Sequence, residues 1–300
     1  MIKRKNLPVA LTIAGSDSGG GAGIQADLKT FAALGVHGAS AIACLTAQNP
    51  RRVLGIEPCS PKMLRQQIEA VFEELKPRAV KTAMLFSAEN VKVIAEFFQN
   101  GFSPSPQRGE GRGEEAKISK LQSPHPGPLP ALAGRGRKFP PPLIVDPILV
   151  STSGAKLLEP KAIAKLKEQL LPLATLVTPN LSEAEILSGQ KISSIEGMRE
   201  VAKKIHSQFG CAVLIKGGHL KNMDEAADIF FDGKTELLLS APFVKGVRTH
   251  GTGCVYSAAV CAALALGNDL PHAVQIGKRF VTKAISESYK IGNHFALGNF

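Results

Sequence analysis

Short apolar runs alternate with amphipathic stretches along most of this 300-residue chain. The runs are rich in β-branched residues and bounded by Gly or Pro, which is typical of buried strands. The longer stretches repeat apolar residues every three or four positions and predict helices. Strands are expected at 7–15, 39–45, 79–85, 143–147, 173–178 and 212–215, and helices at 24–34, 61–75, 88–100, 156–171, shortly after 185, and at 195–209, 255–266 and 271–289. This alternation predicts an α/β fold, with a mostly parallel sheet covered by helices on both faces.

Two stretches depart from the alternation. Residues 228–231 and 237–239 flank Asp232-Gly233 and predict a β-hairpin. Residues 101–142 are dense in Pro, Gly and charge, and such a composition cannot bury enough surface to order itself. We therefore expect one domain over 1–300 with a disordered surface insertion at 101–142. The alternative for the insertion is a basic or polyproline docking arm.

Charge and cysteine content narrow the functional classes. The net charge is +11, of which seven Lys/Arg against three Glu place +4 in 101–142 and leave +7 elsewhere. No arginine cluster interleaved with aromatic residues is present, so no nucleic-acid partner is expected, and an anionic small substrate explains the excess equally well. The five cysteines are scattered without a C-x-x-C pair, which disfavours a disulfide frame or a zinc site.

No apolar run is long enough for a membrane span, and we expect a cytoplasmic protein without a membrane partner.

A glycine-rich turn opens the apolar helix expected at 255–266. In the sequence Thr249-His-Gly-Thr-Gly-Cys254, residues 252–254 would lie where unpaired backbone N–H groups and the helix dipole face outward. The turn is therefore a candidate anion cradle, and the pKa of Cys254 is expected to be lowered there. The alternative is a turn that caps a buried helix, with a cysteine that only packs.

A second glycine loop, 16–23, joins the first strand to its helix. It is not a P-loop, because no glycine precedes Lys29-Thr30. A Rossmann nucleotide-binding loop is a weak alternative, because no acidic residue follows at a second strand end at the expected distance. Gln48 follows the second expected strand and offers both a donor and an acceptor, which suits the edge of a heteroaromatic ring. The alternative for Gln48 is a turn residue that satisfies the local backbone.

Six motifs follow one another at strand ends and helix starts. They are Ala-Gly-Ser-Asp-Ser-Gly-Gly-Gly-Ala-Gly-Ile-Gln-Ala-Asp-Leu-Lys-Thr (14–30), Ala-Gln-Asn (47–49), Val-Asp-Pro (145–147), Thr-Pro-Asn-Leu-Ser-Glu-Ala-Glu (178–185), Lys-Gly-Gly-His (216–219) and Thr-His-Gly-Thr-Gly-Cys (249–254). In this order they closely resemble the hydroxymethylpyrimidine kinase/hydroxymethylpyrimidine-phosphate kinase family of thiamine biosynthesis, in the ribokinase superfamily. The likeness covers nearly the whole chain apart from the insertion. It departs at Ser18, where the family usually has proline, and at Ala83, where glycine is more usual.

The resemblance implies a ribokinase-like three-layer α/β/α sandwich and a kinase that uses ATP and Mg²⁺, with monovalent-cation dependence left open. Such an enzyme phosphorylates 4-amino-5-hydroxymethyl-2-methylpyrimidine and then its monophosphate, and relatives are commonly homodimers. Carried over by motif, the substrate-binding residues would be Gln48, Asp27, Met84, Gly15 and Ala22, and the anion hole and catalytic residues Gly251, Thr252, Gly253 and Cys254. The ATP-binding residues would be Lys216, Gly218, Asn180 and Thr249, and the metal-binding residues Glu183 and Asp146.

Cys254 replaces the aspartate that acts as general base in sugar kinases of the superfamily, so its thiolate could accept the hydroxyl proton. On that reasoning, Cys254→Ala should slow the first phosphorylation more than the second. His219 and His250 are assigned no catalytic role. The alternative functions are a pyridoxal or pyridoxine kinase, a non-catalytic nucleotide-binding relative, and a nucleic-acid-binding protein.

Overall fold

The computed structural model describes residues 6–101, 140–149, 158–218, 220, 224–244 and 250–299. Its centre is an eight-stranded sheet in the order β10-β9-β8-β7-β6-β5-β1-β2. The strands are β1 (Val9–Ala14), β2 (His37–Ile42), β5 (Ala79–Thr82), β6 (Leu143–Val145), β7 (Leu176–Val177), β8 (Ala212–Lys216), β9 (Glu225–Phe231) and β10 (Glu236–Pro242). Strands β2, β1, β5, β6, β7 and β8 are parallel, and β9 runs antiparallel to both β8 and β10. The mostly parallel sheet and the hairpin are therefore confirmed.

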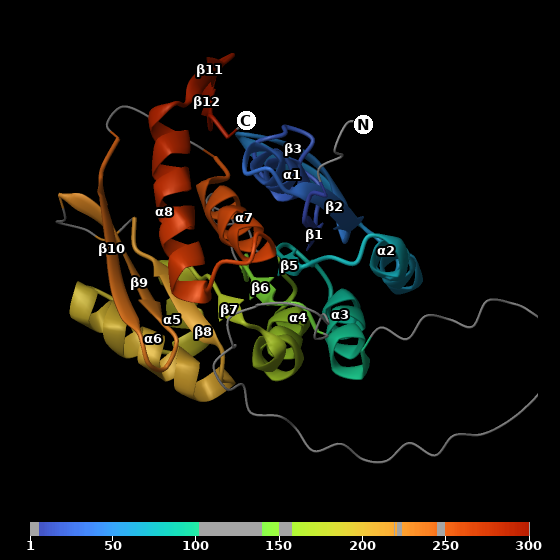
Figure 1. Ribbon diagram of the computed structural model, residues 1–300, viewed down its shortest axis with the longest axis horizontal. Helices are drawn as coiled ribbons and strands as arrows, with labels where there is room; N and C mark the ends of the chain where they lie inside the picture. The colour runs from blue at the N-terminus through green and yellow to red at the C-terminus, as the bar shows by residue number, and fades with distance from the viewer. Residues whose placement is uncertain are drawn as a thin grey trace, which may run out of the picture.

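Helices cover both faces of the sheet (Figure 1). One face carries α1 (Gly23–Ala33), α7 (Thr252–Ala265) and α8 (Leu270–Ser286), and the other carries α2 (Pro61–Glu74), α3 (Ala88–Asn100), α4 (Pro160–Lys165), α5 (Leu181–Ser188) and α6 (Ile195–Phe209). The alternation of side chains along β1 explains this arrangement. Ala10 packs in the core on the side of α1, α7 and α8, whereas Leu11 and Ile13 pack in the core on the side of α2 to α6. The expected three-layer α/β/α fold is confirmed.

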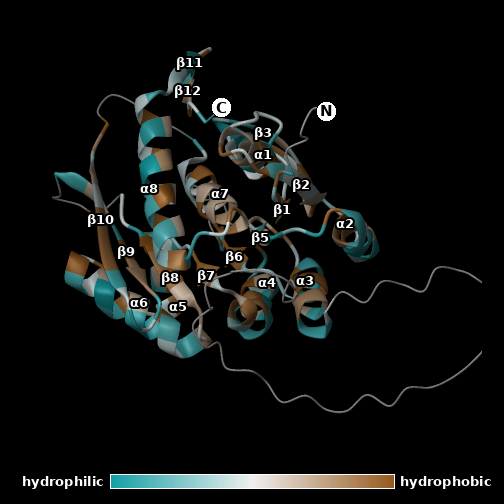
Figure 2. Ribbon diagram, viewed as in Figure 1, coloured by the Kyte–Doolittle hydropathy of each residue, from teal (hydrophilic) through white to brown (hydrophobic). Residues whose placement is uncertain are grey.

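Helix α7 lies at the centre of its layer, between α1 and α8 (Figure 1). Its residues are buried from Cys254 to Ala265, and Figure 2 shows little hydrophilic surface on it, whereas α6 and α8 each carry hydrophilic and hydrophobic sides. An alanine-rich helix lets its neighbours approach closely. A Cβ added to Gly277 of α8 would lie 2.6 Å from Val260 Cγ2 of α7. The core therefore holds the start of α7 in a fixed place.

Several predicted boundaries were wrong. The strand expected at 39–45 is two strands, because the chain leaves the sheet at Ala43 and enters an antiparallel ribbon of β3 (Cys44–Asn49) and β4 (Arg52–Pro58). The helix expected at 156–171 begins at Pro160 and continues as a π-helix (Leu166–Leu170) and a 3₁₀ turn (Leu171–Leu173). The last helix ends at Ser286, and β11 (Tyr289–Ile291) and β12 (His294–Ala296) form a second small hairpin that the sequence analysis did not predict.

The predicted insertion falls between α3 and β6, and residues 102–139 lie outside the described residues. The single-domain division over 1–300 stays a prediction. In the part of the chain that is described, no helix has the length and apolar character needed to cross a membrane.

Candidate active site

The two glycine turns that the sequence singled out contact each other. Gly251 caps the start of α7 with a φ of +86°, a left-handed conformation that favours glycine. A Cβ at this position would overlap the carbonyl oxygen of Gly21 in the first loop. A residue other than glycine at 251 would therefore push the two turns apart.

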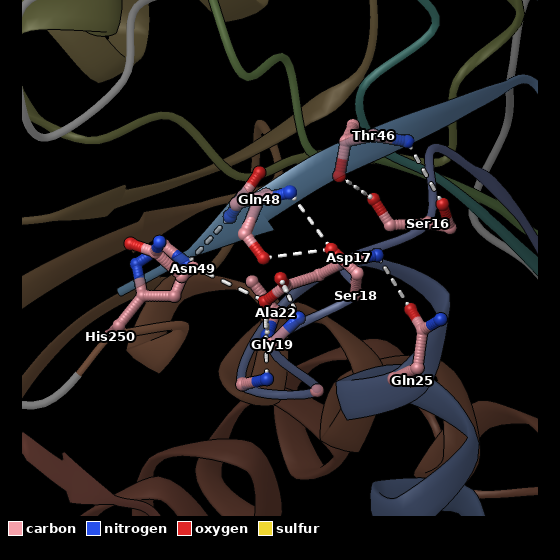
Figure 3. Close-up of polar contacts among 12 residues, drawn as sticks. Ser16, Asp17, Ser18, Gly19, Ala22, Gln25, Thr46, Gln48, Asn49 and His250 are labelled. Atoms are coloured by element: carbon pink, nitrogen blue, oxygen red, sulfur yellow. Dashed lines mark hydrogen bonds and ion pairs between the residues drawn. The ribbon is translucent and has the colours of Figure 1, made fainter. Parts of the chain in front are cut away.

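Asp17 organises the first glycine loop. Its Oδ1 accepts a hydrogen bond from the Gly19 N–H at 2.8 Å, and its Oδ2 accepts from the N–H groups of Gly21 and Ala22 at 3.1 and 2.8 Å (Figure 3). The Asp17 N–H in turn donates to Gln25 Oε1 at 2.7 Å. The role of Asp17 as a loop cap is thus clear. Because the loop amides already bind this carboxylate, the loop serves as a shaped wall rather than as a phosphate cradle.

Gln48 lies on β3 of the ribbon, not just beyond a strand of the main sheet as predicted. The β3–β4 register shifts between Ala47 and Gln48, and such a bulge turns a side chain away from its regular direction. The Gln48 N–H donates to Ser18 Oγ and the Ser18 hydroxyl donates to the Gln48 carbonyl, both at 2.8 Å. One serine therefore ties the ribbon to the glycine loop. The Gln48 side chain reaches His250 just before α7 (Figure 3).

Gly15, Ala22 and Met84 converge beneath this loop. The Gly15 N–H donates to the Met84 carbonyl at 2.9 Å, and a Cβ on Gly15 would lie 2.7 Å from Cys44 Sγ. Ala22 is the N-cap of α1, and the side chains of Ala22 and Met84 are both nearly buried. These residues could form the apolar walls of a small flat pocket.

Asp27 is engaged with the protein itself. Both it and Lys81 are fully buried, with 2.5 Å between Asp27 Oδ1 and Lys81 Nζ, and Thr12 Oγ1 donates to Asp27 Oδ2 at 2.6 Å. Desolvation acts to lower the pKa of Lys81, but the charges of Asp27 and Asp146 and the hydrogen bond to Asp27 raise the pKa overall. Lys81 is therefore a fixed positive charge beneath the start of α7, and Asp27 holds it there. The sequence analysis did not single out Lys81, although a lysine within the apolar run 79–85 is a detectable signal.

The prediction of a lowered pKa for Cys254 is wrong. Burial raises the pKa of this thiol to about 11 and outweighs the opposing charge of Lys81, while the charges of Asp146 and Asp27 add to the rise. The side chain is only 8% exposed. Cys254 is thus a protonated thiol at neutral pH in this state of the molecule.

Lys216, Asp146 and Ser257 meet at the first turn of α7. Lys216 Nζ lies 2.9 Å from Asp146 Oδ1, and Ser257 Oγ donates to Asp146 Oδ2 at 2.9 Å. A Cβ on Gly253 would lie 3.0 Å from Lys216 Nζ, so the ammonium group touches the helix start. Ser257 was missed by the sequence analysis, although it lies one helical turn after Gly253.

Asn180 and Glu183 form a capping box at the start of α5. The Glu183 N–H donates to Asn180 Oδ1 and the Asn180 N–H donates to Glu183 Oε2, both at 2.9 Å. Glu183 Oε1 also accepts from the Leu149 N–H at 3.3 Å. Burial raises the pKa of Glu183 to about 6, with Lys216 opposing and Asp146 adding to the rise. The same two carboxylates raise the pKa of Lys216, although its own desolvation acts in the other direction.

This carboxylate pair fits Mg²⁺, which usually takes one or two protein carboxylates and completes its shell with water and substrate phosphates. Asp146 and Glu183 each accept two bonds in the structure, and a carboxylate has about four acceptor positions. Within the described residues, no group of three or more His, Cys, Asp or Glu side chains is placed to hold a metal ion. The donor set therefore suits an ion delivered together with a nucleotide.

The structure thus brings most of the predicted residues to the start of α7. Gly251, Gly253, Cys254, Lys216, Asp146 and Glu183 belong to one charged cluster, and Gly15, Ala22, Gln48 and Met84 belong to the adjoining walls. Thr252 begins α7, and a Cβ on Gly218 would meet no described atom within 4 Å. Thr249 and His219 lie outside the described residues.

A hollow of about 450 Å³ adjoins the glycine loop. Its described lining comprises Gly19, Gly21, Pro50, Arg51, His250 and residues 291–296 of the β11–β12 hairpin. It does not include Cys254, Lys216 or Asp146. His250 contacts Gln48 and also lines this hollow.

Comparisons with known proteins agree with this geometry. The family model for phosphomethylpyrimidine kinase matches residues 17–105 and 131–299. The hydroxymethylpyrimidine/phosphomethylpyrimidine kinase of Rhizobium meliloti (strain 1021) is 43% identical over 284 residues, which are 94% of this chain and 92% of the relative. A phosphomethylpyrimidine kinase structure from Clostridium difficile 630 has a TM-score of 0.72 and 36% identity over 93% of this chain and 99% of its own. The pyridoxal kinase of Bacillus subtilis, solved as an ADP complex, has a TM-score of 0.76 and 31% identity over 97% of both chains.

Proposed function

The chain belongs to the phosphomethylpyrimidine kinase family, and we propose how its residues phosphorylate the pyrimidine carbinol and then the monophosphate. The predicted kinase activity and its place in thiamine biosynthesis are confirmed by the relatives. ATP as phosphoryl donor is supported by the nucleotide complexes of similar kinases. The residue roles below are our proposal.

The charged cluster at the start of α7 is the single observation that carries this proposal. Phosphoryl transfer depends on positioning and charge neutralisation more than on covalent help from the protein. In the described residues no side chain caps this helix start, so the N–H groups of Gly253 and Cys254 are available to a phosphoryl group. Lys216 Nζ touches the same turn and supplies a fixed positive charge. Together they would hold the transferred group.

The acceptor would lie between this turn and the ribbon. Gln48 would bind the edge of the pyrimidine, and Gly15, Ala22 and Met84 would face its ring. Because Asp27 is fully buried against Lys81, we propose that it positions this lysine and supports the pocket from below rather than contacting the ring. ATP would bind beyond Lys216, where Gly218 leaves open space. Asn180 would position Glu183 through the capping box. Thr249 is proposed as a further ATP-binding residue.

Mg²⁺ is proposed to be held by Asp146 and Glu183. The ion, when bound, would neutralise phosphate charge. Binding would favour the ionised form of Glu183, whose pKa of about 6 already leaves it mostly ionised at neutral pH. Asp146 is held in place for this role by Lys216 and Ser257.

ADP release by the purified full chain tests the function. We expect release with 4-amino-5-hydroxymethyl-2-methylpyrimidine and with its monophosphate, and a roughly 10²-fold or greater loss of kcat in Lys216→Ala. Lys203→Ala, a surface lysine paired with Glu236, is the matched control and should keep its activity. No ADP release with either pyrimidine would contradict the proposal.

A pyridoxine kinase is the second candidate, because one of the similar structures is a pyridoxal kinase. The same assay with pyridoxine separates the two, since faster turnover of pyridoxine than of the pyrimidine would favour this alternative. We further propose a homodimer, supported by the exposed Leu45 and Leu54 on the β3–β4 ribbon, and sedimentation analysis would test it. A cytoplasmic location stays a prediction.

A further inference from the structure

We propose that His250 is a positioning residue that fixes the orientation of the Gln48 side-chain amide and thereby determines which ring edge the site accepts. The inference rests on the proposed contact between Gln48 and the pyrimidine. The two side chains come from segments about 200 residues apart, yet Gln48 Nε2 and His250 Nε2 lie 3.1 Å from each other (Figure 3).

The His250 side chain is 30% exposed and packs on one side against the glycine loop. Its Cδ2 lies 3.6 Å from where a Cβ of Gly21 would be, so the ring rests against the glycine loop. Asp17 Oδ2 is 3.7 Å from His250 Nε2, which is too long for a hydrogen bond, and this oxygen already accepts two backbone N–H groups. The near partner of His250 Nε2 is therefore the Gln48 amide.

The Gln48 backbone is held in place, because both its N–H and its carbonyl bind Ser18 Oγ. What remains undetermined by the backbone is which end of the amide faces the histidine. A neutral imidazole with an unprotonated Nε2 accepts from the Gln48 NH₂ group, whereas a protonated Nε2 requires the amide oxygen instead. The 3.1 Å contact joins Nε2 to the amide nitrogen, so we assign Nε2 as the acceptor of this hydrogen bond and Nδ1 as the ring nitrogen that carries a proton.

The orientation has a chemical consequence. With one amide hydrogen donated to His250, Gln48 presents its Oε1 acceptor and its second N–H donor. A 4-aminopyrimidine offers the complementary order, since its amino group donates and the adjacent ring nitrogen accepts. The 4-oxo analogue reverses that order, with a carbonyl acceptor beside a ring N–H. His250 would thus make the site select the amino ring, because the wrong ring leaves buried polar groups unpaired.

The test compares dissociation constants for the amino carbinol and its 4-oxo analogue, measured by calorimetry on the full chain. We expect His250→Leu to lower the preference for the amino ring by roughly tenfold, because the freed amide can turn to suit either edge. His294→Leu, a histidine that lines the same hollow, is the matched control and should leave the ratio unchanged.

An unchanged ratio in His250→Leu, or an equal weakening of both rings, would overturn the inference, because a purely structural role weakens both alike. Nitrogen NMR of the ligand-free chain is a second test that does not depend on turnover. We expect an unprotonated Nε2 on His250, and a protonated Nε2 would overturn the assignment. A wild-type chain that binds the amino ring selectively but transfers no phosphoryl group would contradict the proposed function and leave the role of His250 supported.

Discussion

At the scale of single residues, the pKa of Cys254 depends on two opposing effects, the helix N-terminus that lowers it and burial that raises it. A helix N-terminus stabilises a negative charge by about 0.3–1 kcal/mol in exposed positions. The rise of the Cys254 pKa from 9.0 to about 11 corresponds to about 2.7 kcal/mol in favour of the protonated thiol. Burial therefore outweighs the helix dipole and the nearby Lys81. The sequence revealed the position of Cys254 on the helix but not its depth in the core.

Cys254→Ala should consequently have a smaller effect than the loss of a general base, which typically costs about 10²–10⁴-fold. We now expect both phosphorylations to slow by a similar factor of less than about 10², because a protonated thiol shapes the pocket in both. This revises the expectation from the sequence that the first step suffers more. Measuring kcat of Cys254→Ala with the carbinol and with the monophosphate tests this expectation. A loss of more than about 10²-fold with the carbinol alone would support Cys254 as a thiolate general base.

Glu183 gives a pH dependence whose direction follows from its raised pKa. Its carboxyl ionises near 4.5 when unfolded and near 6 when folded, so ionisation between these pH values disfavours the folded state. Relative to Glu183→Gln, the wild-type chain should lose about 2 kcal/mol of unfolding free energy as pH rises from 4.5 to above 6. Urea denaturation of both proteins at pH 4.5 and pH 7 measures this difference. A difference that does not change with pH would show that the carboxyl is not held in a disfavoured state.

At the scale of elements, the start of α7 depends on the contact between two turns. Gly251 and Gly267 flank this helix and both have positive φ values, +86° and +96°. A Cβ at Gly267 meets no described atom within 4 Å, whereas one at Gly251 overlaps the Gly21 carbonyl. A substitution at Gly267 therefore tests the strain of a left-handed backbone alone, whereas a substitution at Gly251 adds the steric overlap with Gly21.

Gly267→Ala should cost about 1–2 kcal/mol of unfolding free energy for the left-handed backbone alone. Gly251→Ala should cost a further ~1–3 kcal/mol, or displace the loop that contains Gly21, and should lose kinase activity. Thermal unfolding and kcat of both variants provide the comparison. Equal stability and activity in the two variants would mean that the turns do not need their close contact.

The regular helices were the elements best predicted from sequence. The bounds of α3 and α6 coincide with the predicted 88–100 and 195–209, because amphipathic periodicity and the capping residues Ser87 and Ser194 mark them locally. The β3–β4 ribbon was missed because its strands lie outside the main sheet and are largely exposed, so no apolar run marks them. The position of Gln48 on a bulge of that ribbon could not be predicted for the same reason.

At the scale of the whole molecule, the parallel sheet gathers the site from distant segments. Asp146 follows β6 and Lys216 ends β8, on either side of β7, and α7 supplies Gly253 and Ser257 beside them. The rule that ligands bind at the carboxyl ends of parallel strands predicted this gathering. It could not predict the pairs Lys81–Asp27 and Gln48–His250, because these depend on the side-chain packing between layers.

The insertion should be dispensable. The family model matches the chain on both sides of residues 106–130 but not within them, and the flanking α3 and β6 belong to the core. We expect deletion of 103–138 to leave kcat within about threefold of the full chain, since the closure entropy of a connection between two fixed elements changes only slowly with its length. A coupled assay of the deletion variant measures this. A large loss of activity, with the fold retained by circular dichroism, would give the segment a role in catalysis.

A crystal structure of the full chain with a non-hydrolysable ATP analogue and the amino carbinol tests the central claim most directly. We predict the terminal phosphate at the N–H groups of Gly253 and Cys254, near Lys216, with the carbinol oxygen beside it and the ring edge against Gln48. Ligands bound elsewhere, for example both within the hollow under the β11–β12 hairpin, would contradict it.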